Sequence, residues 1–547
     1  MANRDHAYEA GGSAVLDEAH IGDIRGALGT ISVGDTGARR SFFARLLTLA
    51  AIVGPGLIVM VGDNDAGGVA TYAQAGQNFG LTLLWTLPLL IPVLVVNQEM
   101  VVRLGAVTGV GHARLINERF GRFWGAFSVG DLFVLNFLTI VTEFIGVSLA
   151  LGYFGVNPHI SVPIAAVGLV AMTASGSFRR WERFMLLFVI ANFLVIPLVI
   201  FSHPRIGPVV HGLVIPGVRG GVSSTAVLLI IAIVGTTVAP WQLFFQQSNI
   251  VDKRITPRWI NYERVDTLLG SLVTVFAATL IVVTAAFAFG HTPLSGHFSN
   301  AAGVARGLDR YLGNSAGTLF AIVLLNASII GAAAVTLSTS YAFGDMFSMK
   351  HSLHRRVTDA KAFYATFSAL VVVAAAVVLV PHAPLGLITM AVQALAGVLL
   401  PSATVFLLLL CNDREVLGPW VNRLWLNILA GLIISVLIAL SLILMTTTVF
   451  PHIDVDLVIA ILGIVLAGGV VIAAVLGLRV RVRRLAPGEP QVTRAGRENW
   501  RMPPLALLER PVLSRWRQYT MVAMWGYLAV AIGLLALKAV ELGIGQH

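Results

Sequence analysis

Long runs of apolar residues alternate with short polar or basic connections along most of the chain. Most runs match the roughly 20 residues that an α-helix needs to cross the hydrocarbon core of a bilayer. Backbone that faces lipid must satisfy its own hydrogen bonds, so we expect each run to be helical. The pattern predicts twelve spans, or thirteen if the last run is counted, at residues 46–78, 82–102, 123–153, 160–175, 184–202, 224–248, 267–289, 317–347, 362–380, 385–410, 424–449, 456–478 and 519–541.

Composition supports the same class of protein. Of the 547 residues, 57% are apolar and 12% are charged, whereas soluble globular chains carry about 25% charged residues. This balance excludes an ordinary soluble enzyme, a disordered chain and a nucleic-acid-binding module. The single cysteine, Cys411, excludes an intramolecular disulfide and a cage of several cysteines around a metal. The sequence therefore predicts an all-α polytopic membrane protein.

The basic residues indicate how the chain is oriented. If the N-terminus is cytoplasmic, the inside connections hold 32 of the 37 Lys and Arg residues, as the positive-inside rule requires. The first 40 residues lack the features of a signal peptide, and we expect them to form a flexible cytoplasmic tail. The basic stretch 479–517 is then a cytoplasmic linker, with a lipid-headgroup or nucleic-acid role as the alternative. We expect a multi-pass protein of the plasma membrane with no nucleic-acid partner.

Two of the predicted spans are interrupted by residues that disfavour a membrane helix. The first contains the sequence GDNDAGG at residues 62–68, and the sixth contains Gly235, Thr236, Thr237 and Pro240. Glycine and proline weaken a helix, and carboxylates are expensive inside a membrane. Each interrupted span opens a group of five helices. Broken helices at matching positions of two halves are typical of transporters built from inverted repeats.

This organisation divides the chain into six parts. They are a cytoplasmic tail (1–44), a first membrane repeat with helices 1–5 (45–203), a second repeat with helices 6–10 (204–411), helices 11 and 12 (412–478), a basic linker (479–518) and a thirteenth helix with the C-terminus (519–547).

The interruptions offer oxygen atoms as ligands. Where a helix unwinds, its carbonyl groups can coordinate a cation, and Asp65 supplies a negative charge there. Asp63 lies two residues away and does not share a helix face with Asp65, so the two carboxylates are not expected to clamp one ion. Thr236 and either Gln242 or Gln393 add further oxygens. Neither interruption contains Met, Cys or His, which favours a hard ion such as magnesium.

Several segments resemble the Nramp family of divalent-metal transporters. The segment GPGLIVMVGDNDAGGVATYAQAG resembles the family's first helix, with Asp65-Ala66-Gly67-Gly68 at its Asp-Pro-Gly-Asn motif. Segments GLTLLW (80–85) and RLGAVTG (103–109) resemble the second helix and loop. Ala239-Pro240-Trp241-Gln242 stands at the Met-Pro-His-Asn motif of the sixth helix, and Gln393 with Pro401 resembles the tenth. The resemblance covers residues 45–450 and implies a LeuT-like fold that binds a metal between helices 1 and 6.

The resemblance also implies a ligand set, and this chain departs from it. The family's ligand positions correspond to Asp65, Gly68, the Thr236 carbonyl and Ala239, so the asparagine amide and the methionine thioether are missing. Sulfur favours manganese and iron over magnesium, and two shortened side chains leave room for an ion that keeps several waters. The pattern resembles the Nramp-related magnesium transporter branch. A divergent manganese transporter with a relaxed site is the alternative.

The positions that carry protons in coupled Nramp transporters are also changed. Trp241 replaces the histidine of the sixth helix, and Ile140 replaces the aspartate of the third helix, whereas Glu143 matches the glutamate. Neither replacement can relay a proton, so the resemblance implies uncoupled transport. Glu143 fits an aqueous path or a structural carboxylate equally well.

The remaining polar residues suggest no second chemistry. His112, His351 and His354 lie in basic connections and are expected at the surface, and Glu99 with Arg103 is expected to form a pair at the inner end of helix 2. No nucleophile or phosphate-loop motif stands in a suitable context, so neither an enzyme nor a resident cofactor is expected. A sodium-coupled amino-acid transporter of the same fold remains as an alternative, and a monomer is plausible.

Overall fold

The computed structural model describes residues 17–35, 37–381, 384–449, 453–484, 496–508 and scattered residues from 518 to 533. Its elements are β1 (Ile24–Gly26), β2 (Gly29–Ile31), α2 (Phe42–Ile52), α3 (Pro55–Gly62), α4 (Ala66–Phe79), α5 (Thr86–Thr108), α6 (His112–Phe120), α7 (Arg122–Tyr153), α8 (Pro158–Thr173), α9 (Phe178–Ala191), α10 (Val195–Phe201), α11 (Ile206–Val214), α12 (Ser224–Thr237), α13 (Pro240–Asp252), α14 (Ile260–Phe289), α15 (Ala301–Leu312), α16 (Asn314–Met346), α17 (Lys361–Val378), α18 (Leu385–Cys411), α19 (Arg414–Leu417), α20 (Leu424–Val449) and α21 (Val455–Arg484), with short 3₁₀ turns between some of them.

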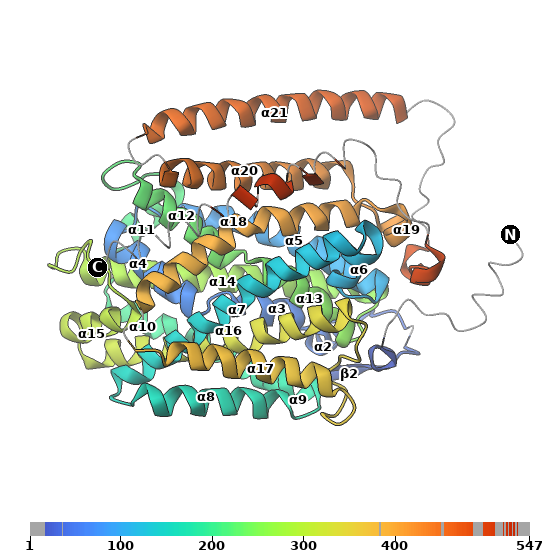
Figure 1. The fold of residues 1–547 in the computed structure, drawn as a ribbon, viewed down its shortest axis with the longest axis horizontal. Helices are drawn as coiled ribbons and strands as arrows, with labels where there is room; N and C mark the ends of the chain where they lie inside the picture. Colours follow the sequence, from blue (N-terminus) through green and yellow to red (C-terminus); the bar gives the residue numbers. More distant parts are fainter. Residues whose placement is uncertain are drawn as a thin grey trace, which may run out of the picture.

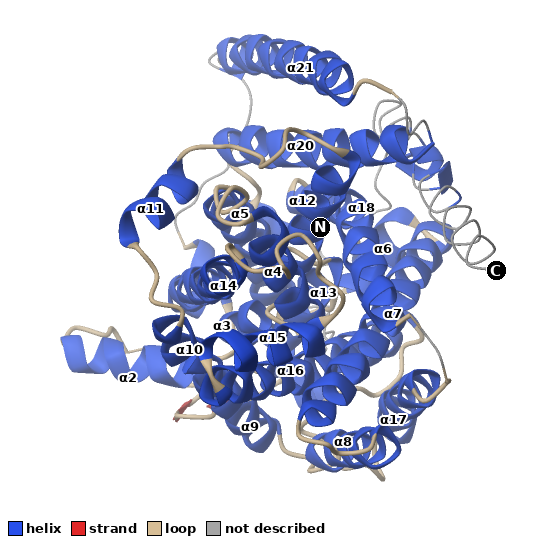
Figure 2. Ribbon diagram, turned by 90° about the vertical axis from the view of Figure 1, so that its left-hand side faces the viewer, coloured by secondary structure: helices blue, strands red, loops and turns tan. Residues whose placement is uncertain are grey.

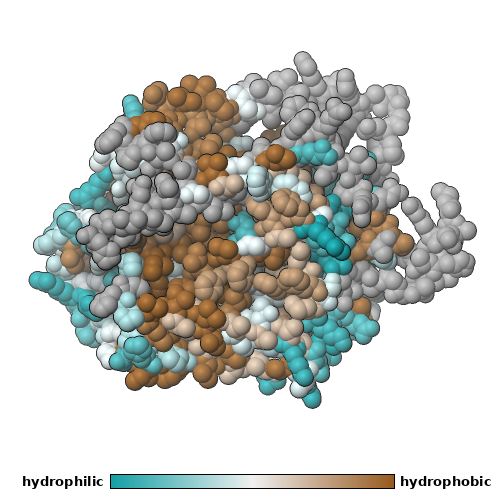
Figure 3. All heavy atoms as spheres, viewed as in Figure 1, coloured by the Kyte–Doolittle hydropathy of each residue, from teal (hydrophilic) through white to brown (hydrophobic). Residues whose placement is uncertain are grey.

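Long helices run side by side along one direction of the molecule (Figure 1). Apolar side chains gather in a band across the middle of the face shown in Figure 3, with polar side chains toward both ends of the helices. Nine helices in the described part of the chain are long and apolar enough to cross a membrane, or ten if the bent pair α2 and α3 forms one span. The all-α polytopic prediction is confirmed.

The helices in the described part of the chain that are long and apolar enough to span a membrane are fewer than the twelve or thirteen predicted spans. Predicted span 4 corresponds to α8, which is short, and predicted span 12 corresponds to α21, a 30-residue helix whose side chains are described only as far as Gly469. The predicted thirteenth span, 519–541, falls largely outside the described residues.

The two interrupted helices lie near the centre of the bundle. In Figure 2, α3, α4 and α13 are surrounded by other helices, whereas α8 and α17 lie at one edge and α20 and α21 at the opposite edge.

The first predicted span is broken twice rather than once. Besides the expected break at residues 63–65, α2 and α3 meet at a 51° bend. Gly54 at this bend has φ +151°, and a Cβ there would strike the carboxylate of Glu182. Glycine is required here because other residues rarely adopt this φ and because any side chain would clash with Glu182.

Charged groups from three other elements hold the bend. The buried Lys253 ammonium donates to the carbonyl oxygens of Ile52 (2.6 Å) and Val53 (2.9 Å) and to Glu182 (2.6 Å). The Asp266 carboxylate of α14 accepts from the backbone N–H groups of Gly54 and Gly56, at 3.1 and 2.7 Å. The carbonyls at the end of α2 and the N–H groups at the start of α3 lack helical partners, so these side chains replace them.

The expectation of a flexible N-terminal tail is wrong for residues 17–35. Strands β1 and β2 form an antiparallel hairpin that packs against α2, with Ile24 opposite Ile31. Asp17 accepts from the Arg355 guanidinium at 2.6 Å, and Arg254 donates to the carbonyl of Ala19 at 2.9 Å. Polar contacts with distant loops fix this segment, and a local sequence pattern does not reveal them.

The histidine expectation is also wrong for two of the three residues. His112 is fully buried and its Nδ1 lies 2.8 Å from the Gln247 side-chain oxygen. Burial lowers the pKa of His112 to about 4, so its ring is neutral at pH 7. His351 is buried against the Asp345 carboxylate at 3.1 Å, whereas His354 is partly exposed. Buried partners from other helices, rather than the basic connections themselves, determine these positions.

Candidate functional site

At the break in the first span, carboxylates accept hydrogen bonds from backbone N–H groups at the start of α4. Helix α3 ends at Gly62 and α4 begins at Ala66, with Asp65 as its N-cap residue. The buried Asp65 carboxylate accepts from the N–H of Gly68 at 2.6 Å. An N-cap oxygen replaces a missing helical acceptor, and the positive end of the helix dipole stabilises its charge. Asp65 therefore has a structural partner before any ion binds.

Glu143 of α7 lies beside Asp65 at the same helix end. Its Oε2 atom accepts from the N–H of Ala66 at 3.1 Å, whereas its Oε1 atom has no hydrogen-bond partner in the described part of the chain. A Cβ on Gly331 of α16 would lie 2.6 Å from Glu143 Oε2 and 2.8 Å from Asp65 Cβ. Glu143 thus makes the contact that the predicted role of a structural carboxylate requires. Its Oε1 atom has no hydrogen-bond partner among the described residues.

The break in the second span lies between α12 and α13. Helix α12 ends at Thr237, and Pro240 begins α13, where its missing N–H needs no acceptor. The Thr237 hydroxyl donates to the Ile233 carbonyl at 2.6 Å. The Thr236 hydroxyl is buried and has no hydrogen-bond partner among the described residues. Ala239, the N-cap residue of α13, is buried and contributes no polar side-chain atom.

The two breaks meet at Gly68. A Cβ on this residue would lie 2.8 Å from the Asp63 carbonyl oxygen, 3.0 Å from Thr236 Oγ1 and 3.4 Å from Asp65 Oδ1. Three oxygens from two broken helices therefore surround the position where another residue would have its side chain. We call this arrangement the Gly68 centre.

Gln393 of α18 reaches the same region. A Cβ on Gly67 would collide with its side-chain amide, and its Nε2 atom has no hydrogen-bond partner in the described chain. The main-chain oxygen of Gln393 packs against Gly235 of α12. The structure therefore brings together four of the five predicted metal-site residues, Asp65, Gly68, Thr236 and Gln393, and places Ala239 at the edge of the same break.

The other predicted pathway residues lie around this centre. Both carboxylate oxygens of the fully buried Asp63 lack a hydrogen-bond partner among the described residues. The Trp241 ring packs near Gly62, where a Cβ would lie 3.3 Å from it. Gln242 accepts a hydrogen bond from Gln98 of α5 at 3.3 Å. Within the described residues, no three His, Cys, Asp or Glu side chains gather in a geometry that could hold a metal ion. Any ion here would depend on main-chain, hydroxyl and amide oxygens as well as on Asp65.

Sequence reasoning missed one contact between the two broken helices. The hydroxyl groups of Tyr72 and Thr237 lie 2.8 Å apart, and the Tyr72 side chain is fully buried. Tyr72 follows Asp65 by seven residues, so the two lie on the same face of α4 about two turns apart. That spacing was the available signal.

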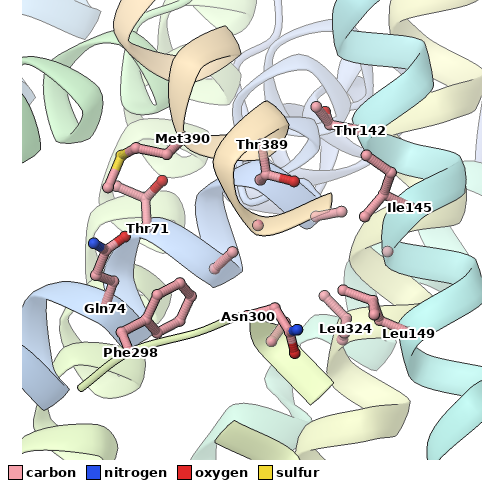
Figure 4. A pocket seen from close by; sticks show the side chains of 15 residues that line it. Thr71, Gln74, Thr142, Ile145, Leu149, Phe298, Asn300, Leu324, Thr389 and Met390 are labelled. Carbon is pink, nitrogen blue, oxygen red and sulfur yellow. The ribbon is translucent and has the colours of Figure 1, made fainter. Parts of the chain in front are cut away.

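A small pocket of about 10 Å³ lies beside the break, on the α4 side. It lies between α4, α7, α15 and α18, and Ala66 forms part of its wall next to Asp65. Figure 4 shows Thr71, Asn300 and Thr389 around it, from three different elements. Polar side chains thus form part of the wall of a pocket beside the break.

The fold and the centre define a polytopic membrane protein with a small, oxygen-lined site between two broken helices. Residues 56–447 match the Nramp family model, described as natural resistance-associated macrophage protein-like. The chain belongs to the Nramp family.

Relatives named divalent metal cation transporter MntH support this membership. The protein from Klebsiella pneumoniae (strain 342) is 26% identical over 408 residues, covering 72% of this chain and 92% of the relative. The protein from Xylella fastidiosa (strain 9a5c) is 29% identical over 448 residues, covering 78% of this chain and 90% of the relative. A solved structure of the Eremococcus coleocola manganese transporter, in complex with an aromatic bis-isothiourea substituted compound, aligns with TM-score 0.59 and 20% identity. It covers 83% of this chain and all of that chain, and it shows the shared fold.

The crowding at Gly68 predicts a loss of stability on substitution. Gly68→Ala forces a methyl group against the Asp63 carbonyl and Thr236. We therefore expect the free energy of unfolding to fall by about 1–3 kcal/mol. Gly152→Ala in α7 is the matched control, because a Cβ there meets nothing within 4 Å, and alanine favours a helix by about 0.5–1 kcal/mol. Thermal unfolding of the purified variants in detergent measures the difference. Equal melting temperatures for the two variants would contradict the geometry of the centre.

Proposed function

We propose that this protein transports divalent metal ions across the plasma membrane by alternating access, with magnesium as its main substrate. The observation that carries the proposal is the Gly68 centre, where Asp65 and neutral oxygens from two broken helices converge in the interior. The names of the relatives support transport of a divalent metal, and nothing in the proposal requires an enzymatic step.

The donor set supports magnesium. It contains oxygen atoms and no sulfur, and Mg²⁺ prefers oxygen ligands and keeps several of its waters. The truncated side chains of Gly68 and Ala239 remove two ligands that would replace such waters. Manganese, which accepts the same ligands, is expected as a second substrate.

We further propose that transport is not coupled to protons. Trp241 and Ile140 are both buried, and neither carries a group that can take up and release a proton between pH 5 and 8. The N–H contact of Ala66 with Glu143 supports a structural role for that carboxylate.

A proton-coupled manganese transporter is the second candidate. The name of the Eremococcus coleocola structure and the free Oε1 atom of Glu143 favour it. A sodium-coupled amino-acid transporter is less well supported, because the Asp65 carboxylate occupies the α4 end that would receive a substrate carboxylate.

The first prediction of the proposed function concerns Asp65. Asp65→Ala removes the negative charge of the centre, and we expect magnesium uptake into proteoliposomes to fall to background while the protein stays monodisperse. A magnesium-sensitive dye inside the vesicles measures uptake. Asp359→Ala, which removes an exposed carboxylate, is the control and should transport like the wild type. Uptake by Asp65→Ala at the wild-type rate would show that the ion binds elsewhere.

The second prediction concerns coupling. Magnesium influx should leave the internal pH unchanged, and an inside-negative potential should accelerate it, because two uncompensated charges cross the membrane. A pH dye inside the same vesicles reports proton movement, and a protonophore added afterwards confirms that the dye responds. Acidification that depends on magnesium would favour the proton-coupled candidate.

The third prediction concerns selectivity. Ala239→Met adds a thioether at the α13 break, and we expect cadmium to bind roughly fivefold tighter or more, since soft metals prefer sulfur ligands. Ala239→Leu is the control, because it has a similar size and no sulfur. Calorimetry on the purified proteins measures both affinities. Equal cadmium binding by the two variants would mean that position 239 does not face the ion.

A further inference from the structure

A second polar feature lies away from the Gly68 centre, toward the end of the molecule that carries the N-terminal hairpin. A groove of about 320 Å³ opens where the second half of α5 meets the start of α14, the loop before α20 and the short 3₁₀ turn Arg497–Asn499. Four guanidinium groups line it, those of Arg103, Arg264, Arg423 and Arg497. We call this feature the arginine groove.

The positive charge of the arginine groove is only partly balanced. Glu99 is the single carboxylate in its lining, and it pairs both with Arg103 (3.0 Å) and with Arg264 (2.5 Å). Arg423 is exposed and forms no ion pair among the described residues, and Arg497 stacks over the Trp420 ring at 4.2 Å. The exposed Glu498 adds one further negative charge near Arg497. The groove therefore keeps a net positive charge.

The arginines also retain unused donors. The Nε atoms of Arg103 and Arg264 are buried without a hydrogen-bond acceptor in the described part of the chain, and Arg103 is only 4% exposed. Burial, followed by repulsion from Arg264 and Arg423, lowers the pKa of Arg497. Several positive charges surround one recess and repel one another, and some of their N–H donors have no acceptor. An anion bound there would reduce the repulsion and accept hydrogen bonds from these donors.

The other end of the groove is apolar. Val95 and Val96 lie about eight residues before Arg103 on α5, or about 12 Å along the helix axis toward the middle of the membrane. Trp425 and Leu426 at the start of α20 form the facing wall, and the Trp425 side chain is 58% exposed. Charge at one end and exposed apolar surface at the other match a molecule with an anionic head and a hydrocarbon tail. A soluble phosphate would use only the charged end.

We propose that the arginine groove binds a phosphate-bearing ligand and that this ligand is an anionic phospholipid of the bilayer. Its phosphate lies among the four guanidinium groups, because a guanidinium group can donate two parallel hydrogen bonds to one phosphate. Its acyl chain follows Val95 and Trp425. Basic recesses between membrane helices on the cytoplasmic side are suited to such head groups. Arg497 belongs to the basic stretch 479–517, so part of that stretch acts at the membrane surface.

The test uses the full-length purified protein in a neutral detergent. Native mass spectrometry counts lipids retained on titration with phosphatidylglycerol or with phosphatidylcholine. The variant R423Q/R497Q removes two charges from the groove, and we expect it to bind phosphatidylglycerol roughly tenfold or more weakly, because each such charge near the surface contributes about fivefold. The matched control R356Q/R414Q removes two exposed arginines outside the groove and should bind like the wild type.

A separate arm distinguishes the source of the phosphate. Phosphatidylglycerol should raise the melting temperature of the wild type and of R356Q/R414Q, whereas inorganic phosphate at the same concentration should not. If R423Q/R497Q does not fold, the single variant R423Q at an exposed position replaces it and should lose about fivefold in affinity. Unchanged phosphatidylglycerol binding by the groove variant, equal retention of phosphatidylcholine, or equal stabilisation by inorganic phosphate would overturn the proposal.

Discussion

The structure depends on how main-chain polar groups are satisfied where a membrane helix is interrupted. Each interruption leaves N–H and C=O groups without helical partners, in a medium that supplies no water. At the α2–α3 bend, Lys253 and Asp266 provide the missing partners. At the α3–α4 break, Asp65 and Glu143 do so. Helices α7 and α14 and the segment after α13 must therefore pack where these side chains can reach.

This constraint also defines which oxygens are left for an ion. Asp65 Oδ1 already accepts from Gly68, and Glu143 Oε2 already accepts from Ala66. The Thr236 hydroxyl and both Asp63 carboxylate oxygens have no such partners among the described residues, whereas the unpartnered atom of Gln393 is its Nε2 donor. Asp65 Oδ1 thus serves both the cap of α4 and the Gly68 centre, whereas the Thr236 hydroxyl belongs to the centre alone. A helix end that is already capped can keep its shape when an ion enters or leaves.

The two ends of the molecule are built differently. On the α4 side, polar residues line a cavity next to Ala66. On the other side, the N-terminal hairpin packs on α2, and the Lys253–Glu182 pair lies directly beneath it, since the N–H of Ala27 donates to Glu182. Breaking one partner of a buried ion pair costs about 3–5 kcal/mol, so the bend at Gly54 is firmly held in this arrangement. The arginine groove is a further polar feature toward that end.

The sequence by itself determined the class of fold and the positions of the two central breaks. Long apolar runs leave few alternatives to membrane helices, and the residues GDNDAGG and Pro240 disrupt a helix wherever they occur. The same local signals predicted Asp65 and Thr236 as site residues, whereas Gly68 was predicted from the resemblance to the Nramp family. Only the tertiary structure decided that Gly68 lies against Thr236, that Tyr72 meets Thr237, and that His112 and His351 are buried. These contacts join residues more than a hundred positions apart or depend on burial by other helices. A local pattern records which residues favour a break or a helix, but it does not record which distant side chain fills the space beside it.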